Sequence, residues 1–157
     1  NSIDMNTDVI EGNKLTLNTG IIIGNNITQE DVNRVNGNRL IALFMGADVD
    51  ENQATVVDHF PDKEGNIINK YVMGKYYFPN KDNNDYDKVC NLWQLKYHSS
   101  WDWLMPVWTK VKNIGADIGV SFKLFWNKFH VGIDTDIKVS WKAVVEFITW
   151  YNKTIKE

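Results

Sequence analysis

The fourteen residues 95–108 constrain the fold most, because five aromatic or imidazole rings, two serines and a carboxylate occur among them. Residues 93–97, which overlap the beginning of this stretch, have the pattern of a strand. Ser99 is well placed to cap a following helix, with Asp102 three residues later able to reach back to it. We therefore predict a strand over 93–97 that leads into a helix capped by Ser99 and ending at Gly115.

One face of this helix is expected to anchor the core. Pro106 lies too deep for the first turn, so it removes one backbone hydrogen bond and is expected to kink the helix. The chain has seven Trp, seven Phe and six Tyr, so burial should come in large pieces. We predict a core face that consists of Trp101, Leu104, Met105 and Trp108, in which Trp101 fills a large buried site.

The composition is that of a soluble globular protein. The chain has 157 residues, of which 43% are hydrophobic and 24% charged, and its net charge is -3. This charge disfavours nucleic-acid partners, and no apolar run is long enough for a membrane span. A single cysteine, Cys90, excludes an internal disulfide and suits a reducing cytoplasm. A monomer and a homo-oligomer both stay open.

The remaining segments predict an α+β protein. Short strands are expected at 15–17, 21–23, 54–57, 67–73 and 75–78, joined by turns rich in Gly, Asn and Asp. Strand runs joined by short turns favour a mainly antiparallel sheet, with two or three helices packed on one face, in a single domain. Residues 1–36 are expected to be a divergent N-terminal extension of a domain that spans 37–157.

Three further elements are predicted from local patterns. A helix should start at Thr28, either break or start a second time near 36–38, and end at Gly46. Residues 118–133 are expected to form a β-hairpin with Asn127-Lys128 as its turn. The most regular helical stripe lies in the last segment and consists of Trp141, Val144, Val145, Ile148 and Tyr151.

Three segments resemble a family of small proteins carried by tailed bacteriophages and prophages, many from gut Bacteroidota. The matching residues, given as sequence, are GNRLIALFMG at 37–46, LKYHSSWDWLMPV at 95–107 and VVEFITWYN at 144–152. Together they cover about a fifth of the chain. The resemblance implies a phage-encoded accessory protein that acts in the cytoplasm of the bacterial host cell, and it brings no catalytic residue.

Several constellations suggest chemistry but have simpler explanations. His98, Ser99 and Asp102 invite a hydrolase interpretation, although helix capping accounts for the serine and the aspartate. The acidic run 48–52 resembles the opening of a calcium loop, but the glycine and the final glutamate of such a loop are missing, so a solvated acidic loop is expected. His59, His98 and His130 lack the short spacings of zinc sites. No metal and no cofactor are therefore expected.

A binding site is predicted where the central helix begins. Capping and packing explain most of the stretch 95–108, but they leave a basic residue, a phenol, an imidazole and an indole: Lys96, Tyr97, His98 and Trp103. Such a group suits a small anionic, nucleotide-like ligand or a host protein. We predict a non-enzymatic phage accessory protein, with counter-defence as an attractive role. A small hydrolase with a site assembled around His98, from distant residues such as His59, stays open as the alternative.

Overall fold

The computed structural model describes most of the chain. The described residues are 9–11, 14–17, 20–23, 29–61, 63–65, 67–80, 82, 85–119 and 122–154. The chain divides into two compact units, which we call the sheet unit (Asn1–Asn36 and Gly46–Leu95) and the helix unit (Gly37–Met45 and Lys96–Glu157). One border between them, after Asn36, coincides with the expected start of the domain 37–157; that domain division itself stays a prediction.

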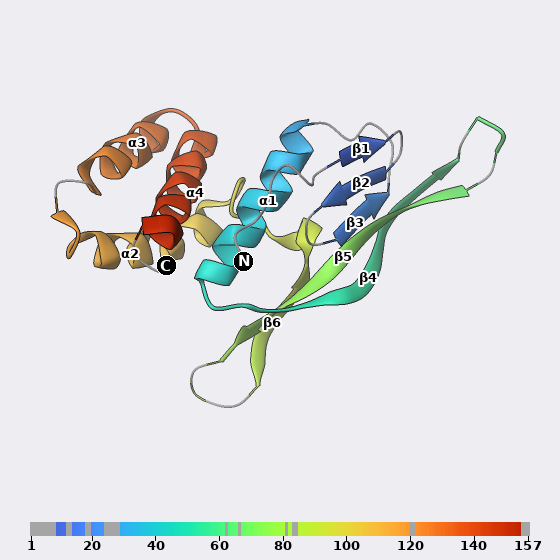
Figure 1. Cartoon of the computed structure of the whole chain (residues 1–157), viewed down its shortest axis with the longest axis horizontal. Helices are drawn as coiled ribbons and strands as arrows, with labels where there is room; N and C mark the ends of the chain where they lie inside the picture. The colour runs from blue at the N-terminus through green and yellow to red at the C-terminus, as the bar shows by residue number, and fades with distance from the viewer. Residues whose placement is uncertain are drawn as a thin grey trace. The chain divides into compact units, whose positions relative to one another are not determined.

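The sheet unit contains a six-stranded sheet in its described residues (Figure 1). The order is β1-β2-β3-β5-β4, with β6 paired to β5, and every pairing is antiparallel. The α+β class and the antiparallel sheet are therefore confirmed. The strands are β1 (Val9–Glu11), β2 (Lys14–Leu17), β3 (Gly20–Ile23), β4 (Asp48–Pro61), β5 (Ile67–Pro79) and β6 (Tyr86–Asn91).

Several strand boundaries differ from the sequence-based expectation. The two strands expected at 67–73 and 75–78 form the single strand β5, which continues through Gly74 at a φ of 102°. The acidic run 48–52, expected as a loop, is the first part of β4, which has a strand neighbour on one side only in the sheet order. An edge strand tolerates such charges because one side of it remains open to water.

The strand expected at 93–97 is not formed. A 3-10 helix, Leu92–Gln94, follows β6 directly. The backbone N–H of Asn91 donates to the Gln94 Oε1 at 2.9 Å, and the N–H of Gln94 donates to the Asn91 Oδ1 at 3.1 Å. These reciprocal bonds close a turn around the two side chains and end the strand at Asn91.

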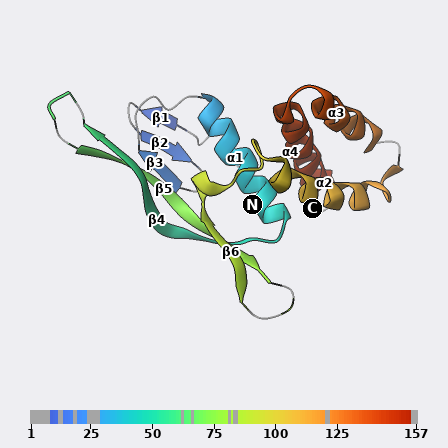
Figure 2. The same ribbon diagram turned by 180° about the vertical axis from the view of Figure 1, so that it is seen from behind.

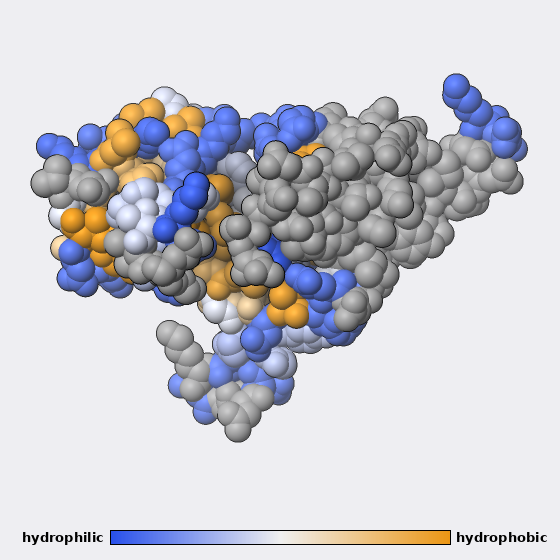
Figure 3. Space-filling model, in the orientation of Figure 1, coloured by the Kyte–Doolittle hydropathy of each residue, from blue (hydrophilic) through white to orange (hydrophobic). Residues whose placement is uncertain are grey.

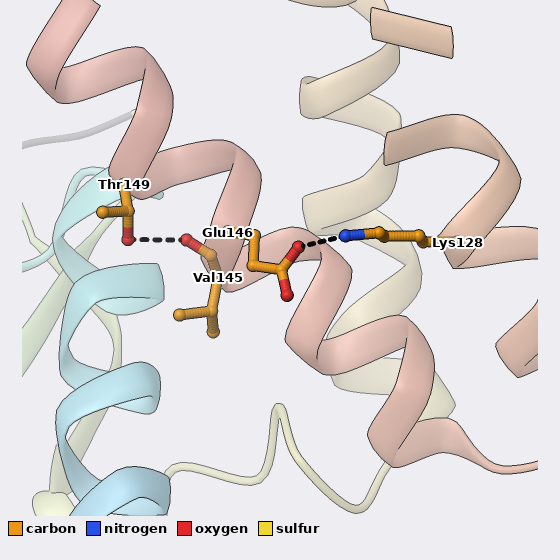
Figure 4. A network of polar contacts seen from close by, with 4 residues as sticks. All are labelled: Lys128, Val145, Glu146 and Thr149. Atoms are coloured by element: carbon orange, nitrogen blue, oxygen red, sulfur yellow. Dashed lines mark hydrogen bonds and ion pairs between the residues drawn. The ribbon is translucent and has the colours of Figure 1, made fainter. Parts of the chain in front are cut away.

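The helix unit is built from three helices and the C-terminal half of α1. Helices α3 and α4 run side by side in both views (Figures 1 and 2). They are linked by an ion pair of 2.9 Å between Lys128 and Glu146, drawn in Figure 4 beside the hydrogen bond from Thr149 to the Val145 carbonyl. The helices are α1 (Gln29–Phe44), α2 (Trp101–Gly115), α3 (Phe122–Asp134) and α4 (Ile137–Thr154).

The break or second start expected in α1 at 36–38 is wrong, because the helix runs without interruption through Gly37. A Cβ atom at this position would overlap the indole ring of Trp141. Gly37 therefore allows a close approach of α4 instead of ending the helix. The expected stop is confirmed, since α1 ends at Phe44 and Gly46, two residues later, has a φ of 88°.

The hairpin expected over 118–133 is also wrong. Most of this segment is α3, and Asn127-Lys128 lies in the middle of the helix. The apolar residues are spaced by three and four, which brings them onto one side of a helix, and tertiary burial of this side outweighs the local turn signal. The buried residues are Phe122, Phe125, Phe129 and Gly132.

Helices α2 and α4 lie where the sequence predicts them. The expected end of α2 at Gly115 is confirmed, and Pro106 lies inside the helix. The helix begins one residue later than expected, with Ser100 in place of Ser99 at the N-cap. Its buried face is also rotated away from Met105, which is 39% exposed. The buried residues of α2 are Leu104, Val107, Trp108, Val111 and Gly115.

Stacked aromatic rings form the core of the helix unit. The rings of Trp108 and Phe129 lie parallel, with centroids 3.9 Å apart and an interplanar angle of 3°. Trp108 also stacks on Phe122 at 5.7 Å, and Phe122 meets Phe147 of α4 edge-on at 5.8 Å. The centre of this core is therefore Trp108. Trp101 is half-buried at its margin, and its ring centroid lies 6.2 Å from that of Phe129.

Candidate functional site

The four predicted site residues lie within the turn before α2 and the first turn of this helix, all in the helix unit. Lys96 is exposed, and His98 and Trp103 are half-buried. Tyr97 is buried, with 4% of its surface exposed. Lys96, His98 and Trp103 therefore retain surface that a ligand can reach. Tyr97 is buried and acts through its contact with Trp103.

The ring of Tyr97 packs against the indole of Trp103. The two rings meet edge-to-face, with centroids 5.1 Å apart and an interplanar angle of 85°. This is a preferred geometry for aromatic pairs, because the positive edge of one ring faces the negative face of the other. The contact fixes the orientation of the Trp103 indole at the start of α2.

The beginning of α2 has no side-chain cap. The N–H groups of Ser99 and Ser100 both donate to the Lys96 carbonyl, at 3.1 and 2.9 Å, which closes the turn. Ser100 has extended backbone angles, and its hydroxyl makes no capping hydrogen bond. Within the described part of the chain, the backbone N–H groups of Trp101 and Asp102 donate no hydrogen bond. The end of the helix therefore keeps the partial positive charge of its orphan amides.

A buried asparagine holds His98 in place. Asn38 of α1 is 1% exposed, and its Nδ2 lies 2.8 Å from the His98 Nδ1. Its Oδ1 accepts a hydrogen bond of 2.9 Å from the Trp141 Nε1 of α4. One side chain thus joins α1, the turn before α2 and α4.

This arrangement determines the tautomer of neutral His98. An indole N–H only donates, so the Asn38 atom opposite Trp141 is the carbonyl oxygen and the atom opposite His98 is the amide nitrogen. That amide nitrogen donates, so the His98 Nδ1 must supply a lone pair. The proton of the neutral imidazole is therefore on Nε2, and this nitrogen is a hydrogen-bond donor.

This tautomer does not suit a general base of the serine-hydrolase type. In such enzymes Nδ1 donates to a carboxylate, and the lone pair of Nε2 accepts the proton of the nucleophile. Here Nδ1 accepts instead. Neither the Ser99 hydroxyl nor the Asp102 carboxylate makes a hydrogen bond to His98. The three residues singled out in the sequence as a triad are neighbours without the contacts of one.

The other histidines and the cysteine lie elsewhere. His59 belongs to β4 of the sheet unit, and His130 lies in α3, where its ring stacks on Trp126 at 4.5 Å and its Nδ1 donates to the Trp126 carbonyl at 2.9 Å. Burial raises the pKa of the Cys90 thiol, and the nearby charge of Lys88 opposes this only in part, which makes it a poor nucleophile. Among the described residues, no group of three or more acidic, His or Cys side chains is arranged to hold a metal ion.

Sequence reasoning did not find Asn38 and Trp141 as parts of this site. In the sequence, Trp141 belongs to the apolar stripe of the last helix, and Asn38 lies in the segment 36–38 with its turn-forming residues. They are 103 residues apart in the chain, and a pairing over that separation leaves no local pattern. Asn38 itself lies among polar residues, Asn36 and Arg39, so nothing in its surroundings marks it as a buried bridging residue.

Comparisons with known protein families, with curated proteins and with solved structures give no match to this chain. Among the helices described, none is both long and apolar enough to cross a lipid bilayer.

Proposed function

We propose that the protein is a non-enzymatic, phage-encoded accessory protein that binds an anionic group at the beginning of α2 in the host cytoplasm. The phage origin is supported by the resemblance of three segments to a phage protein family. Counter-defence, in which the protein sequesters a signal or blocks a defence enzyme, is the role that such an origin favours. The hydrogen bond between Asn38 and His98 is the single observation that carries the binding proposal.

The chemistry of the site supports an anion for three reasons. The Nε2–H of His98 is a donor, because Asn38 occupies the lone pair of Nδ1. Lys96, two residues earlier, contributes an exposed ammonium group. The uncapped start of α2 adds backbone N–H groups and a partial positive charge. Asp102 is exposed in the first turn of the helix and opposes this charge, which limits the affinity.

The half-buried indole of Trp103 favours a phosphate that is attached to a base. Its ring is held by Tyr97, and an indole offers a stacking surface to a nucleobase. A nucleotide-like signal therefore fits better than an inorganic anion. An acidic segment of a host protein presents the same anionic chemistry without the base, so the two sources can be separated by experiment.

The test is a binding titration of the full chain with ATP, GTP, a cyclic dinucleotide and a Glu-rich peptide. We expect one nucleotide probe to bind, and Lys96→Ala to weaken it about tenfold through loss of a charge-assisted hydrogen bond. Lys142→Ala, which removes an exposed lysine of α4, is the matched control and should leave binding unchanged. Binding of the peptide alone would instead identify a host-protein partner.

Two results would overturn the proposal. The first is the absence of binding for every probe, or binding that Lys96→Ala and Lys142→Ala affect equally. The second is hydrolysis of a bound nucleotide, measured as phosphate release, that the His98→Gln variant no longer performs although it still binds the nucleotide. That second result would establish the hydrolase alternative.

A further inference from the structure

Helix α3 exposes large apolar residues in addition to those that it buries. Its buried face contacts α2 and α4, but large apolar residues are also exposed outside that face. Their exposed fractions are 59% for Leu124, 40% for Trp126, 55% for Val131 and 48% for Ile133. Figure 3 shows such hydrophobic surface over the helix unit. Large apolar side chains that are exposed close together often mark a surface that further protein covers.

The exposed residues of α3 follow a regular pattern. Leu124 and Val131 are seven residues apart and share one flank of the helix, and Trp126 and Ile133 share the other flank in the same way. Between the flanks runs a polar line that contains Lys123 and Asp134. The outward side therefore has a polar centre and two apolar borders.

The two charges of this line are placed against the helix dipole. Lys123 lies in the first turn of α3 and Asp134 is its last residue, whereas dipole interactions favour acidic residues at the start of a helix and basic ones at its end. Neither side chain makes an ion pair within the described part of the chain. Lys128, by contrast, is paired with Glu146 (Figure 4).

We propose that α3 is the interface of a homodimer, in which it packs antiparallel against α3 of a second copy. The helix is complementary to itself in this orientation. Antiparallel pairing places Lys123 opposite Asp134 of the second copy, and the two-fold symmetry repeats this pair. The same arrangement sets Leu124 against Val131 on one flank and Trp126 against Ile133 on the other. The midpoints of the two apolar pairings lie about one residue, roughly 1.5 Å of helix rise, on either side of the midpoint of the charged pairing. One symmetry axis near Lys128 therefore brings all three pairings within contact range.

A parallel arrangement would place equal charges opposite each other at both ends of the helix, which disfavours it. The antiparallel dimer also explains why Lys123 and Asp134 have charges that interact unfavourably with the dipole of their own helix. Each of them lies near the oppositely charged end of the partner helix. The dimer is independent of the proposed anion site, which lies at the start of α2.

The test is the mass of the full chain in solution, measured by sedimentation equilibrium and native mass spectrometry over a concentration series. We expect a dimer at tens of micromolar, and about tenfold weaker dimerisation for each of Lys123→Asp and Asp134→Lys. The double variant Lys123→Asp with Asp134→Lys should restore the dimer, because it re-creates both pairs with their signs exchanged. Lys142→Asp on α4 is the control for the change in net charge.

These variants separate a loss of dimerisation from a loss of folding. Each charge reversal improves the interaction with the dipole of α3, so lost dimerisation would not reflect a weakened helix. Circular dichroism checks this directly. A wild-type chain that is monomeric at about 100 μM would overturn the proposal, and so would a dimer that the single reversals leave unchanged.

Discussion

Replacing Trp108 by alanine is expected to lower the free energy of unfolding by about 3–5 kcal/mol, the largest single effect in the helix unit. The side chain is 2% exposed and stacks on Phe129 at 3.9 Å and on Phe122 at 5.7 Å. Alanine leaves a cavity between α2 and α3 that these rings cannot fill without giving up their own contacts. Urea denaturation followed by far-UV circular dichroism measures the loss.

Trp126→Ala is the matched control for this prediction. Trp126 also contacts the Trp108 ring, at 5.7 Å, but 40% of its surface is exposed, so a clearly smaller loss is expected. Trp101→Ala should likewise cost less than Trp108→Ala, because Trp101 is only half-buried. A loss below about 1 kcal/mol for Trp108→Ala would show that the aromatic stack is not the centre of the core.

The second large effect is expected for Asn38→Leu, which should lower the free energy of unfolding by about 2–3 kcal/mol. Leucine has a similar size, but it removes the acceptor of the Trp141 Nε1–H and the donor to the His98 Nδ1. The indole N–H is then left without a partner in a buried place, since Trp141 is only 7% exposed. Chemical denaturation provides the measurement.

Two further variants make this result specific. Asn113→Leu changes an exposed asparagine of α2 and should have little effect on stability. Asn38→Asp keeps an acceptor for Trp141 but turns a second oxygen toward the His98 Nδ1, which then needs a proton. We expect it to retain more stability than Asn38→Leu. Equal losses for Asn38→Leu and Asn113→Leu would contradict the bridging role of Asn38.

The sequence predicted elements well where a single periodicity dominated. The stripe of α4 and the β2–β3 pair were found because apolar spacing and turn residues indicated the same structure. The start of α2 was misjudged by one residue, since two adjacent serines offer equivalent caps. The strand expected at 93–97 failed because side-chain bonds between Asn91 and Gln94 end β6 earlier.

The two larger errors have a common physical cause. Short Asn-containing segments at 36–38 and 127–128 suggested a break and a turn, but both lie inside helices. Local turn preferences amount to fractions of a kcal/mol per residue and are outweighed when a helix face is buried. Gly37 in particular is explained only by Trp141, more than a hundred residues later in the chain.

The candidate site was predictable in part. The sequence indicated the turn before α2 because its side chains exceeded what capping and packing require. It did not show that Tyr97 is buried beneath Trp103, or that Asn38 orients His98. These features depend on three-dimensional contacts between helices. The direction in which a histidine presents its proton is set by such contacts and not by its neighbours in sequence.

The tautomer of His98 is the most direct test of the account, because a donating Nε2–H distinguishes an anion-binding site from a catalytic base. Long-range ¹H–¹⁵N correlation spectra at about pH 8, above the usual titration of imidazole, report it for each histidine. We expect His98 to carry its proton on Nε2, while His130, which donates from Nδ1 to the Trp126 carbonyl, shows the opposite pattern in the same spectrum. His98→Gln assigns the signal. A proton on Nδ1 of His98 would contradict the account and leave the Nε2 lone pair available to act as a base.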